Sequence, residues 1–382
     1  MTVEFASALS QHPDASEAVG EVVGIALEAL GGTSPDLAVC FASADHVDAV
    51  ADIAEALRTA LGPGTLLGGT AASVIGGPRE VESGPALSLF TGQLSGSTLT
   101  PVALTLTETP DGPALSGWPA SVASEGATLL LVADPFTFPA DQFLAYANDH
   151  RPGLQVIGGL ASAAMRPGGN RLVLDDQVTD AGAVGVVVSG GTPIRTLVSQ
   201  GCRPIGQPYV VTRGERNLVA ELGGKPAIER LQEIAATASP EERELMRAGL
   251  HVGLVVDEHQ AEFARGDFLV RNLIGADQES GVLAVGDVVS VGQTLQFHVR
   301  DAAAADEDLR ELIAGIEADA ALLFTCNGRG QHLFGEPDHD AGIVAGLLGD
   351  VPLAGCFCAG EIGPVGGRNF LHGFTASVAL FG

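Results

Sequence analysis

Apolar and polar positions alternate along the chain in a way that predicts three copies of one arrangement. The first copy begins with the apolar run LAVCFAS (37–43), and apolar residues between Val47 and Leu61 then recur at helical spacing. TLLGGTAAS (65–73) follows as a strand that runs into a glycine-rich loop, and GPALSLFTG (84–92) closes the copy as a further strand. We therefore expect the order strand, helix, strand, strand.

Two later parts of the chain repeat this order. The second copy contains LLLVAD (129–134), a helix after Pro139, LQVIGGLASA (154–163) and AGAVGVVVSG (181–190). The third copy contains ALLFTCNGRG (321–330), a helix after Pro337, VPLAGCFCAGE (351–361) and GFTASVALFG (373–382). Parallel strands need crossover connections, so helices between apolar strands predict layered sheets. The expected fold class is α/β, with layered sheets and crossover helices built from repeated strand–helix–strand–strand units.

The stretch YVVTRGERNLVAELGG (209–224) predicts a hairpin, and a new helical region begins near Lys225. We place a domain boundary at this change of pattern. The sequence therefore predicts an N-terminal domain of residues 1–208 and a C-terminal domain of residues 209–382. The first two copies would belong to the former and the third copy to the latter.

The composition limits the partners and the compartment. Hydrophobic residues make up 46% of the 382 residues, which is enough for a sizeable core. The formal net charge of −28 would repel nucleic acids and anionic membranes, so neither is expected as a partner. No apolar stretch approaches the length of a membrane span, and the opening residues lack the pattern of a signal peptide. The five cysteines, an odd number, indicate reduced thiols, and we predict a cytoplasmic protein.

Two cysteines lie one residue apart in the third copy. Cys356 aligns with a glycine in both other copies (Gly69 and Gly159), and Cys358 aligns with an alanine in both. The position therefore requires small side chains, and cysteine satisfies this requirement as a small, easily buried residue. A reactive or ligand-contacting thiol stays open as an alternative. A zinc site is disfavoured because the pair has no obvious second pair of ligands.

The turn FTCNGRG (324–330) presents polar groups directly after an apolar strand, where α/β sheets hold their ligands. Arg329 would hold a carboxylate, Asn327 would serve as donor or acceptor, and Glu361 would take an ammonium group. A structural ion pair is the alternative for Arg329. No catalytic residue is predicted, and EPDHDAG (336–342) indicates an exposed helix start. The candidate ligand-binding residues are Cys326, Asn327, Gly328, Arg329, Gly330, Cys356, Cys358, Glu361, Arg368 and Asn369.

Several long motifs resemble the FIST family. TLLGGTAASVIGGPREVESGPALSLF (65–90) is similar to the signature of the FIST N-terminal domain. FTCNGRG, GDFLVRNLIGAD (266–277) and GCFCAGEIGPVGGRNFLHGFTASVALF (355–381) resemble the FIST C-terminal domain. The resemblance implies a sensory module of signal transduction that binds amino acids or similar small molecules, and in some relatives haem and nitric oxide. It also suggests secondary candidates for a pocket wall, which are Arg271, Asn272, Arg300 and Asp301.

Three functions follow as hypotheses. The leading one is a cytosolic sensor that binds an amino-acid-like or other small anionic ligand without catalysis and without a cofactor. The alternative is a haem-binding nitric oxide sensor, with His46, His332 and His372 as candidate axial ligands. The third is an enzyme with Cys326 or Cys358 as nucleophile, for which no base is identifiable. The copies and the strands between them fill the chain, so we expect a separate signalling output protein or a homo-oligomer to pass on the signal.

Overall fold

The computed structural model describes residues 4–382 except 110–111, 120–121, 123, 261 and 350. The chain divides into two compact units, which we name the threefold unit (up to 198, 309–371 and 375–382) and the barrel unit (199–308 and 372–374). The boundary predicted at 208/209 lies inside β15 (Cys202–Glu215), a strand of the barrel unit. None of the helices in the described ranges has the length and apolar character that a membrane span requires.

The three copies predicted from the sequence all lie in the threefold unit. Their first strands are β2 (Leu37–Ser43), β9 (Thr128–Ala133) and β22 (Ala320–Cys326). Each first strand pairs in parallel with the second strand of its own copy: β3 (Thr65–Ala71), β10 (Gln155–Leu160) or β23 (Leu353–Cys358). Each also pairs antiparallel with the closing strand: β6 (Leu87–Gly92), β13 (Ala183–Gly190) or β26 (Thr375–Phe381). The predicted α/β class and its repeated units are thus confirmed.

Helices connect the first and second strands of each copy, as the apolar spacing predicted. They are α2 (Val50–Leu61), α3 (Ala140–His150) and α8 (His339–Leu348). A short 3-10 helix, η1 (Ala44–Ala49), precedes α2, and a short helix, α7 (Gln331–Phe334), precedes α8. Two further helices are α1 (Ala15–Ala29), whose N-terminus is capped by the Asp14 carboxylate, and α6 (Ala302–Ile313).

Each copy also contains a β-hairpin that follows its second strand and was expected only as a glycine-rich loop. The hairpins are β4–β5 (Val74–Gly76 and Arg79–Val81), β11–β12 (Leu172–Leu174 and Gln177–Thr179) and β24–β25 (Glu361–Val365 and Arg368–His372). None of them joins the sheet of its own copy. β4 pairs with β23 of the third copy, β11 with β3 of the first, and β24 with β10 of the second. The copies therefore exchange hairpins in a closed ring.

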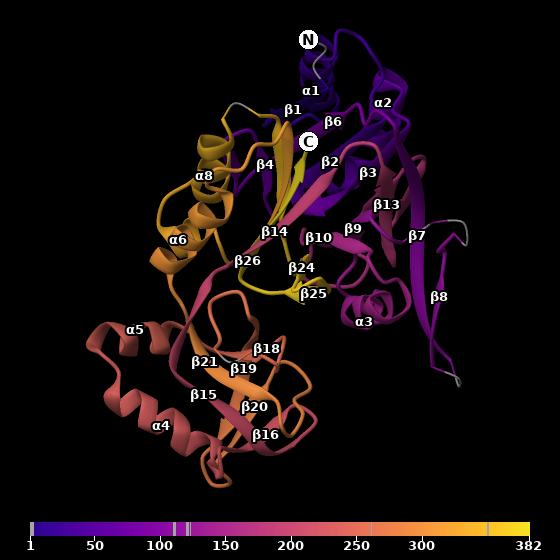
Figure 1. The fold of residues 1–382 in the computed structure, drawn as a ribbon. Helices are drawn as coiled ribbons and strands as arrows, with labels where there is room; N and C mark the ends of the chain where they lie inside the picture. The colour runs from indigo at the N-terminus through magenta and orange to yellow at the C-terminus, as the bar shows by residue number, and fades with distance from the viewer. Residues whose placement is uncertain (1–3, 110–111, 120–121, 123, 261, 350) are drawn as a thin grey trace. The chain divides into compact units, whose positions relative to one another are not determined.

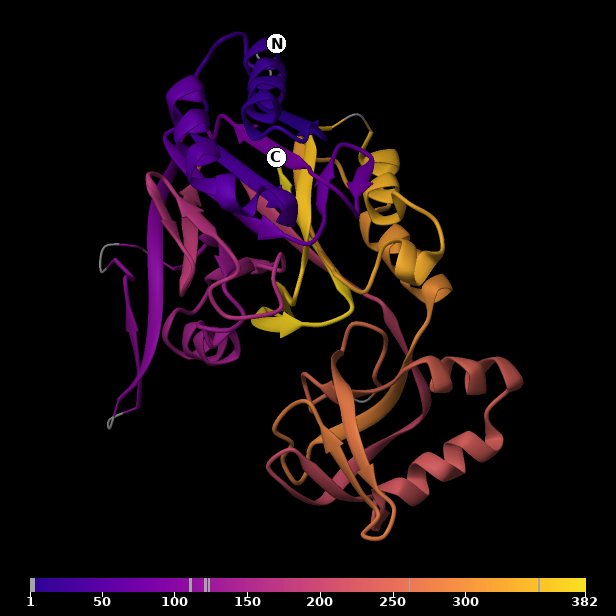
Figure 2. The same ribbon diagram turned by 180° about the vertical axis from the view of Figure 1, so that it is seen from behind.

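The opposite edge of each sheet is extended by strands that precede the copy. β1 (Phe5–Ser10) pairs with β6, β7 (Ser97–Thr109) with β13, and β14 (Ile194–Gln200) with β26, while β8 (Gly112–Ser116) pairs with β7. Figure 1 shows α1 and α2, α3 and α8 on three different sides of this unit, and Figure 2 shows the same arrangement from behind. The inner faces of the three sheets bury one shared core, in which Phe41 and Phe324 pack edge to face at 5.9 Å.

One glycine recurs because the parallel strands approach each other closely. At Gly158 and Gly355 a Cβ atom would lie 1.9 Å from a carbonyl oxygen of the paired first strand, and at Gly68 it would lie 2.3 Å away. The three glycines occupy the same register position of β10, β23 and β3. A side chain there would force the strands apart, so the repeated glycine is a requirement of the sheet.

The barrel unit consists of antiparallel strands around a core of its own. Its strands are β15, β16 (Leu218–Leu222), β17 (Lys225–Pro226), β18 (Leu250–Val255), β19 (Phe268–Asp277), β20 (Val282–Val285) and β21 (Thr294–Arg300). Pairing of β15 with both β21 and β16 closes the sheet on itself. The helix α4 (Ala227–Thr237) contributes Ile228 and Ile234 to the core, and the half-buried Leu245 of α5 (Pro240–Ala248) packs against it.

Candidate functional site

The candidate site lies where β22 and β23 of the third copy end. Cys326 lies directly opposite Cys358 in the parallel pairing of these strands. Cys356 occupies the register position that Gly69 and Gly159 occupy in the other copies, so the alignment predicted from the sequence is confirmed. Registered pairs and alternate residues point to the same face of a sheet, so the three thiols share the inner face. Cys356 and Cys358 are buried, and Cys326 is half-buried.

The turn after β22 is held by its own backbone. The Asn327 amide donates to the Cys358 carbonyl at 3.0 Å, and the Arg329 amide donates to the Cys326 carbonyl at 2.8 Å. Gly330 has a φ of +63°, and a Cβ there would lie 2.7 Å from a Glu82 carboxylate oxygen. Only glycine fits this conformation and this approach. The turn consequently directs Arg329 inward, while Asn327 stays exposed.

Arg329 is fully buried and forms an ion pair with Asp340 of α8. Its Nε donates to one carboxylate oxygen at 2.6 Å, and its Nη2 donates to the other at 2.9 Å. Its guanidinium also lies 5.2 Å from the centre of the Phe334 ring. Nη1 has no hydrogen-bond partner among the described residues. Arg329 therefore forms the structural ion pair that the sequence offered as an alternative, and its Nη1 nitrogen still has no hydrogen-bond partner among the described residues.

The expectation of an exposed helix start at residues 336–342 holds for Glu336, which is exposed just before α8, but it is wrong for Asp340. Asp340 is fully buried. Its carboxylate is paired with Arg329 and also accepts a hydrogen bond from the Thr325 hydroxyl at 2.7 Å. Burial alone would raise the pKa of Asp340, but the charge and hydrogen bonds of Arg329 and the bond from His339 hold it well below its usual range. The Asp338 carboxylate accepts a hydrogen bond from the Glu80 amide at 2.6 Å. Asp340 therefore lies in the interior of the unit, and the half-buried Asp338 bonds to the backbone of β5.

Glu361, the first residue of β24, is also fully buried. One of its oxygens accepts hydrogen bonds from the Thr375 amide at 3.1 Å and from the Thr375 hydroxyl at 2.8 Å. The other, Oε1, has no nitrogen or oxygen donor within reach among the residues described. Burial raises the pKa of Glu361 to about 8, although the Thr375 bonds, the Arg329 charge and a hydrogen bond with Cys326 oppose the rise. Its carboxyl group is therefore able to exchange a proton near neutral pH.

Glu80 is another buried acid near this site, and the sequence did not predict its burial. Glu80 lies on β5, the hairpin strand that the first copy lends to the third sheet, and its carboxylate accepts the Ala341 amide at 2.9 Å. Burial and the nearby charge of Asp340 raise the pKa of Glu80 to about 8. Burial likewise raises the pKa of the Cys358 thiol well above its usual value, and the hydrogen bond with Cys356 adds to the rise.

Two of the predicted residues lie at the other end of the β24–β25 hairpin. Arg368 is exposed, and its guanidinium is 3.8 Å from the Asp149 carboxylate. Asn369 is buried, and its side chain bonds to Asn148 and to the backbone at both sides of the start of β10. The structure thus brings together the residues of β22, β23 and the start of β24, and it places Arg368 and Asn369 beside α3.

The secondary candidates lie in the barrel unit. Arg271 and Asn272 are on β19, Arg300 ends β21, and Asp301 follows it. Arg271 pairs with an aspartate and Asp301 with an arginine, each at 2.6 Å. Arg300 lies over a phenylalanine ring at 4.9 Å. These contacts stabilise strand ends of the barrel.

The three candidate haem ligands differ in their surroundings. His46 is buried in η1, and its Nε2 has no hydrogen-bond partner in the described part of the chain. His332 is exposed on α7, and His372 is buried at the end of β25. No group of three or more histidine, cysteine, aspartate or glutamate side chains is placed to hold a metal ion, as far as the described ranges extend.

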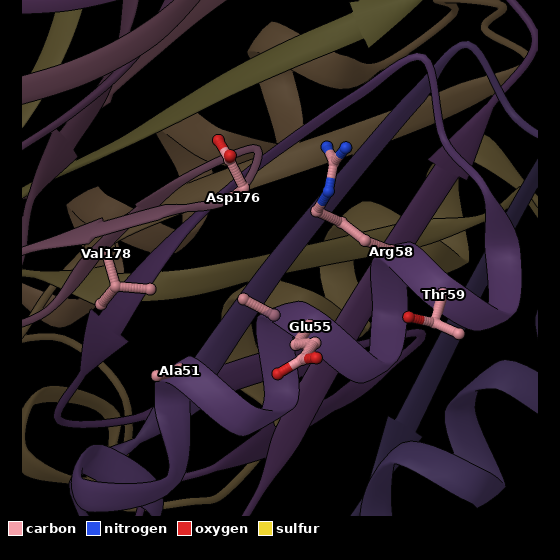
Figure 3. Close-up of a pocket in the computed structure, with 7 residues that line it drawn as sticks. Ala51, Glu55, Arg58, Thr59, Asp176 and Val178 are labelled. Atoms are coloured by element: carbon pink, nitrogen blue, oxygen red, sulfur yellow. The ribbon is translucent and has the colours of Figure 1, made fainter.

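Three surface hollows of the threefold unit lie away from these residues. One of about 520 Å³ lies between α2 and the β11–β12 hairpin, and Figure 3 shows Glu55, Arg58 and Asp176 around it. Arg58 is 3.2 Å from the Asp175 carboxylate, so its charge is already partly matched. A second hollow, of about 420 Å³, is lined by residues 126–128 and 190–194 among others, and a third, of about 300 Å³, lies between α1 and α2.

The comparisons with known proteins agree with this architecture. The FIST N domain matches residues 36–225, and the FIST C domain matches residues 227–364. The chain belongs to the FIST family. FIST domains are generally sensory domains of signal transduction. The FIST C match contains β22, β23 and the start of β24, so the candidate site lies within it.

Mycobacterial relatives resemble this FIST chain over almost their whole length. It is 44% identical to the uncharacterized protein Rv0628c of Mycobacterium tuberculosis strain H37Rv over 379 residues, which cover 98% of both chains. It is 45% identical to the uncharacterized protein Mb0898c of Mycobacterium bovis over 377 residues, which cover 97% of this chain and 96% of the relative.

Proposed function

We propose that this FIST chain is a cytoplasmic sensor that binds an amino-acid-like or other small anionic ligand at the ends of β22 and β23 without catalysis. One observation carries the proposal. Arg329 Nη1 is a buried donor without a partner among the described residues, and Glu361 Oε1 is a buried acceptor without a nitrogen or oxygen donor there, although the Glu361 carboxyl group also hydrogen-bonds with Cys326. Unpaired buried polar groups destabilise a fold, so such atoms mark places where a ligand replaces missing bonds.

The chemistry of the two groups fits a zwitterion. Asp340 holds the Arg329 guanidinium by two nitrogens, so the third nitrogen has a fixed direction before any ligand arrives. A ligand carboxylate would accept its hydrogen bond. Glu361, with a pKa of about 8, would ionise when it receives an ammonium group. The exposed Asn327 would close the site at its solvent side, and the signal would pass to a separate output protein.

A thermal-shift screen with the standard amino acids, acetate and methylammonium tests the proposal. A ligand at about a hundred times its dissociation constant stabilises the folded state by roughly 2.7 kcal/mol, which raises the melting temperature by a few degrees. Glu361→Gln keeps the shape of the side chain but removes the acceptor charge, and we expect it to abolish the shift that an amino acid causes.

Glu80→Gln is the matched control, because Glu80 is also buried and has a similarly raised pKa of about 8. We expect this variant to keep the ligand-induced shift. Equal loss in both variants would show a general effect of buried charge, and an unchanged shift in Glu361→Gln would remove the ligand from this site.

A further inference from the structure

The thiols of the third copy form a continuous row across two strands. Cys358 lies between Cys326, its partner in the β22–β23 register, and Cys356, whose Sγ is 3.7 Å from the Cys358 Sγ. Neighbouring strands lie about 4.7–4.9 Å apart, which falls inside the Cα separation of roughly 4.4–6.8 Å that disulfides require. Residues two apart on one strand are about 6.6 Å apart, close to the upper limit. The geometry thus favours Cys326 over Cys356 as the partner of Cys358.

Cys326 is also the thiol that a reagent meets first. It is half-buried, whereas Cys356 and Cys358 are buried. The Gly328 amide donates to its Sγ at 3.4 Å, and the positive charge of Arg329 acts on it. Its side chain also hydrogen-bonds with Glu361. An N–H donor, a cation and a proton acceptor around one sulfur are the features that favour a nucleophilic thiolate.

We propose that Cys326 and Cys358 are a redox-sensitive thiol pair, which a hydroperoxide oxidises to a disulfide. Cys326 is the thiol that reacts with the oxidant, and Cys358 is the thiol that resolves the product. This site uses residues of the proposed ligand site, but it requires no bound ligand and no output partner.

The reaction balances in two steps. In its ionised form, Glu361 takes the proton of the Cys326 thiol, and the thiolate attacks the terminal oxygen of the hydroperoxide. The O–O bond breaks, Cys326 becomes a sulfenic acid, and the alkoxide leaves as an alcohol with the proton from Glu361. The Cys358 sulfur then attacks the sulfenic sulfur; the S–S bond forms, the S–O bond breaks, and hydroxide leaves with the Cys358 proton as water. The two thiols lose two electrons, and an external dithiol restores them by exchange.

Mass mapping of the full chain after treatment with tert-butyl hydroperoxide tests the pair. The expected product has two thiols fewer than the five of the untreated chain and a peptide that links residues 326 and 358. Cys358→Ala removes the resolving thiol, and alanine is the residue that the other copies carry at this position (Ala71 and Ala161). In that variant we expect a sulfenic acid on Cys326, detected as a dimedone adduct, and no linked peptide.

Cys40→Ala is the matched control, because Cys40 is a buried thiol in the first copy without a cysteine neighbour in its register. It should form the 326–358 link like the wild type, and Cys326→Ala should not form it. The proposal is overturned if Cys326→Ala loses thiols as the wild type does, if mapping links Cys356 to Cys358, or if dimedone labels another cysteine. The thermal shift that amino acids cause in the untreated wild type and in Cys40→Ala separates failure of the thiol pair from failure of the ligand site.

Discussion

The first two copies of the threefold unit and the third copy place different chemistry at one shared position. After β2 in the first copy, the Ser43 hydroxyl accepts the Ala86 amide at 2.9 Å. After β9 in the second copy, the buried Asp134 carboxylate accepts hydrogen bonds from two backbone or hydroxyl groups of the next turn and from the Asn170 amide. Both positions are fully used by the fold. The equivalent residue of the third copy is Cys326.

The difference shows how a repeated scaffold acquires a site. The strand pairing and the close glycine contact are the same in all three copies, so they belong to folding. Around Cys326, by contrast, the buried Arg329 and Glu361 side chains each keep a polar atom without a nitrogen or oxygen partner among the described residues. The third copy therefore has, beside Cys326, polar atoms that the hydrogen bonds of the fold leave available. The following predictions test this contrast.

The largest expected effect comes from Asp340→Ala. It leaves the Arg329 guanidinium buried without its counter-charge, and breaking a buried pair in this way costs about 3–5 kcal/mol. The measurement is the free energy of unfolding in urea. Glu244→Ala, which removes an exposed partner of Arg247, should cost no more than about 1 kcal/mol. A loss of equal size in the two variants would mean that Arg329 finds another partner.

The next effect tests the equivalence of the copies. Gly158→Ala and Gly355→Ala each place a Cβ 1.9 Å from a carbonyl oxygen, and we expect both to destabilise the fold by roughly 1–3 kcal/mol or more. Gly346→Ala is the control, because Gly346 lies inside α8 with no atom near its added Cβ. This change should stabilise the chain by about 0.5–1 kcal/mol. A negligible loss at either 158 or 355 would contradict the shared close approach of the strands.

The pH dependence of stability provides a third test. Glu361 has a folded-state pKa of about 8 against an ordinary value of 4.5. Between these values the unfolded chain releases a proton that the folded chain keeps, so stability decreases as pH rises from about 4.5 to about 8. The slope is at most about 1.4 kcal/mol per pH unit for this group.

Glu361→Gln removes this dependence. We therefore expect the variant to become progressively more stable relative to the wild type as pH rises through that window. Urea unfolding at several pH values measures the difference. Parallel profiles for the two proteins would show that Glu361 is already ionised in the folded state.

The smallest expected effect is at the far end of the β24–β25 hairpin. Arg368→Ala removes an exposed cation 3.8 Å from Asp149, and the free energy of unfolding should change by less than about 0.5 kcal/mol. An amino acid should still cause its full thermal shift. Loss of the shift in this variant would mean that the ligand site includes Arg368, as the sequence predicted.

The sequence predicted the three copies because each strand and helix has a strong apolar period of its own. It did not predict the hairpins as strands, since segments as short as Val74–Gly76 pair with another copy far along the chain. It placed Cys326 and Glu361 together because crossover strands end at one sheet edge. It missed Asp340 and Glu80, since acids near a helix start are usually exposed and only the buried Arg329 and the exchanged hairpin hold them inside.

The exchange of hairpins bears on how such a chain originates and on whether one copy can be removed from it. One copy as a separate molecule would have a hairpin without a sheet and a sheet edge without a hairpin. Three identical molecules would satisfy each other as a swapped trimer with cyclic symmetry, and this chain has the connectivity of that trimer joined end to end. A solenoid loses a terminal repeat and keeps the rest. Here the loss of any one copy would take the hairpin from one remaining sheet and leave the hairpin of the other remaining copy without a sheet, so no copy can be removed by itself.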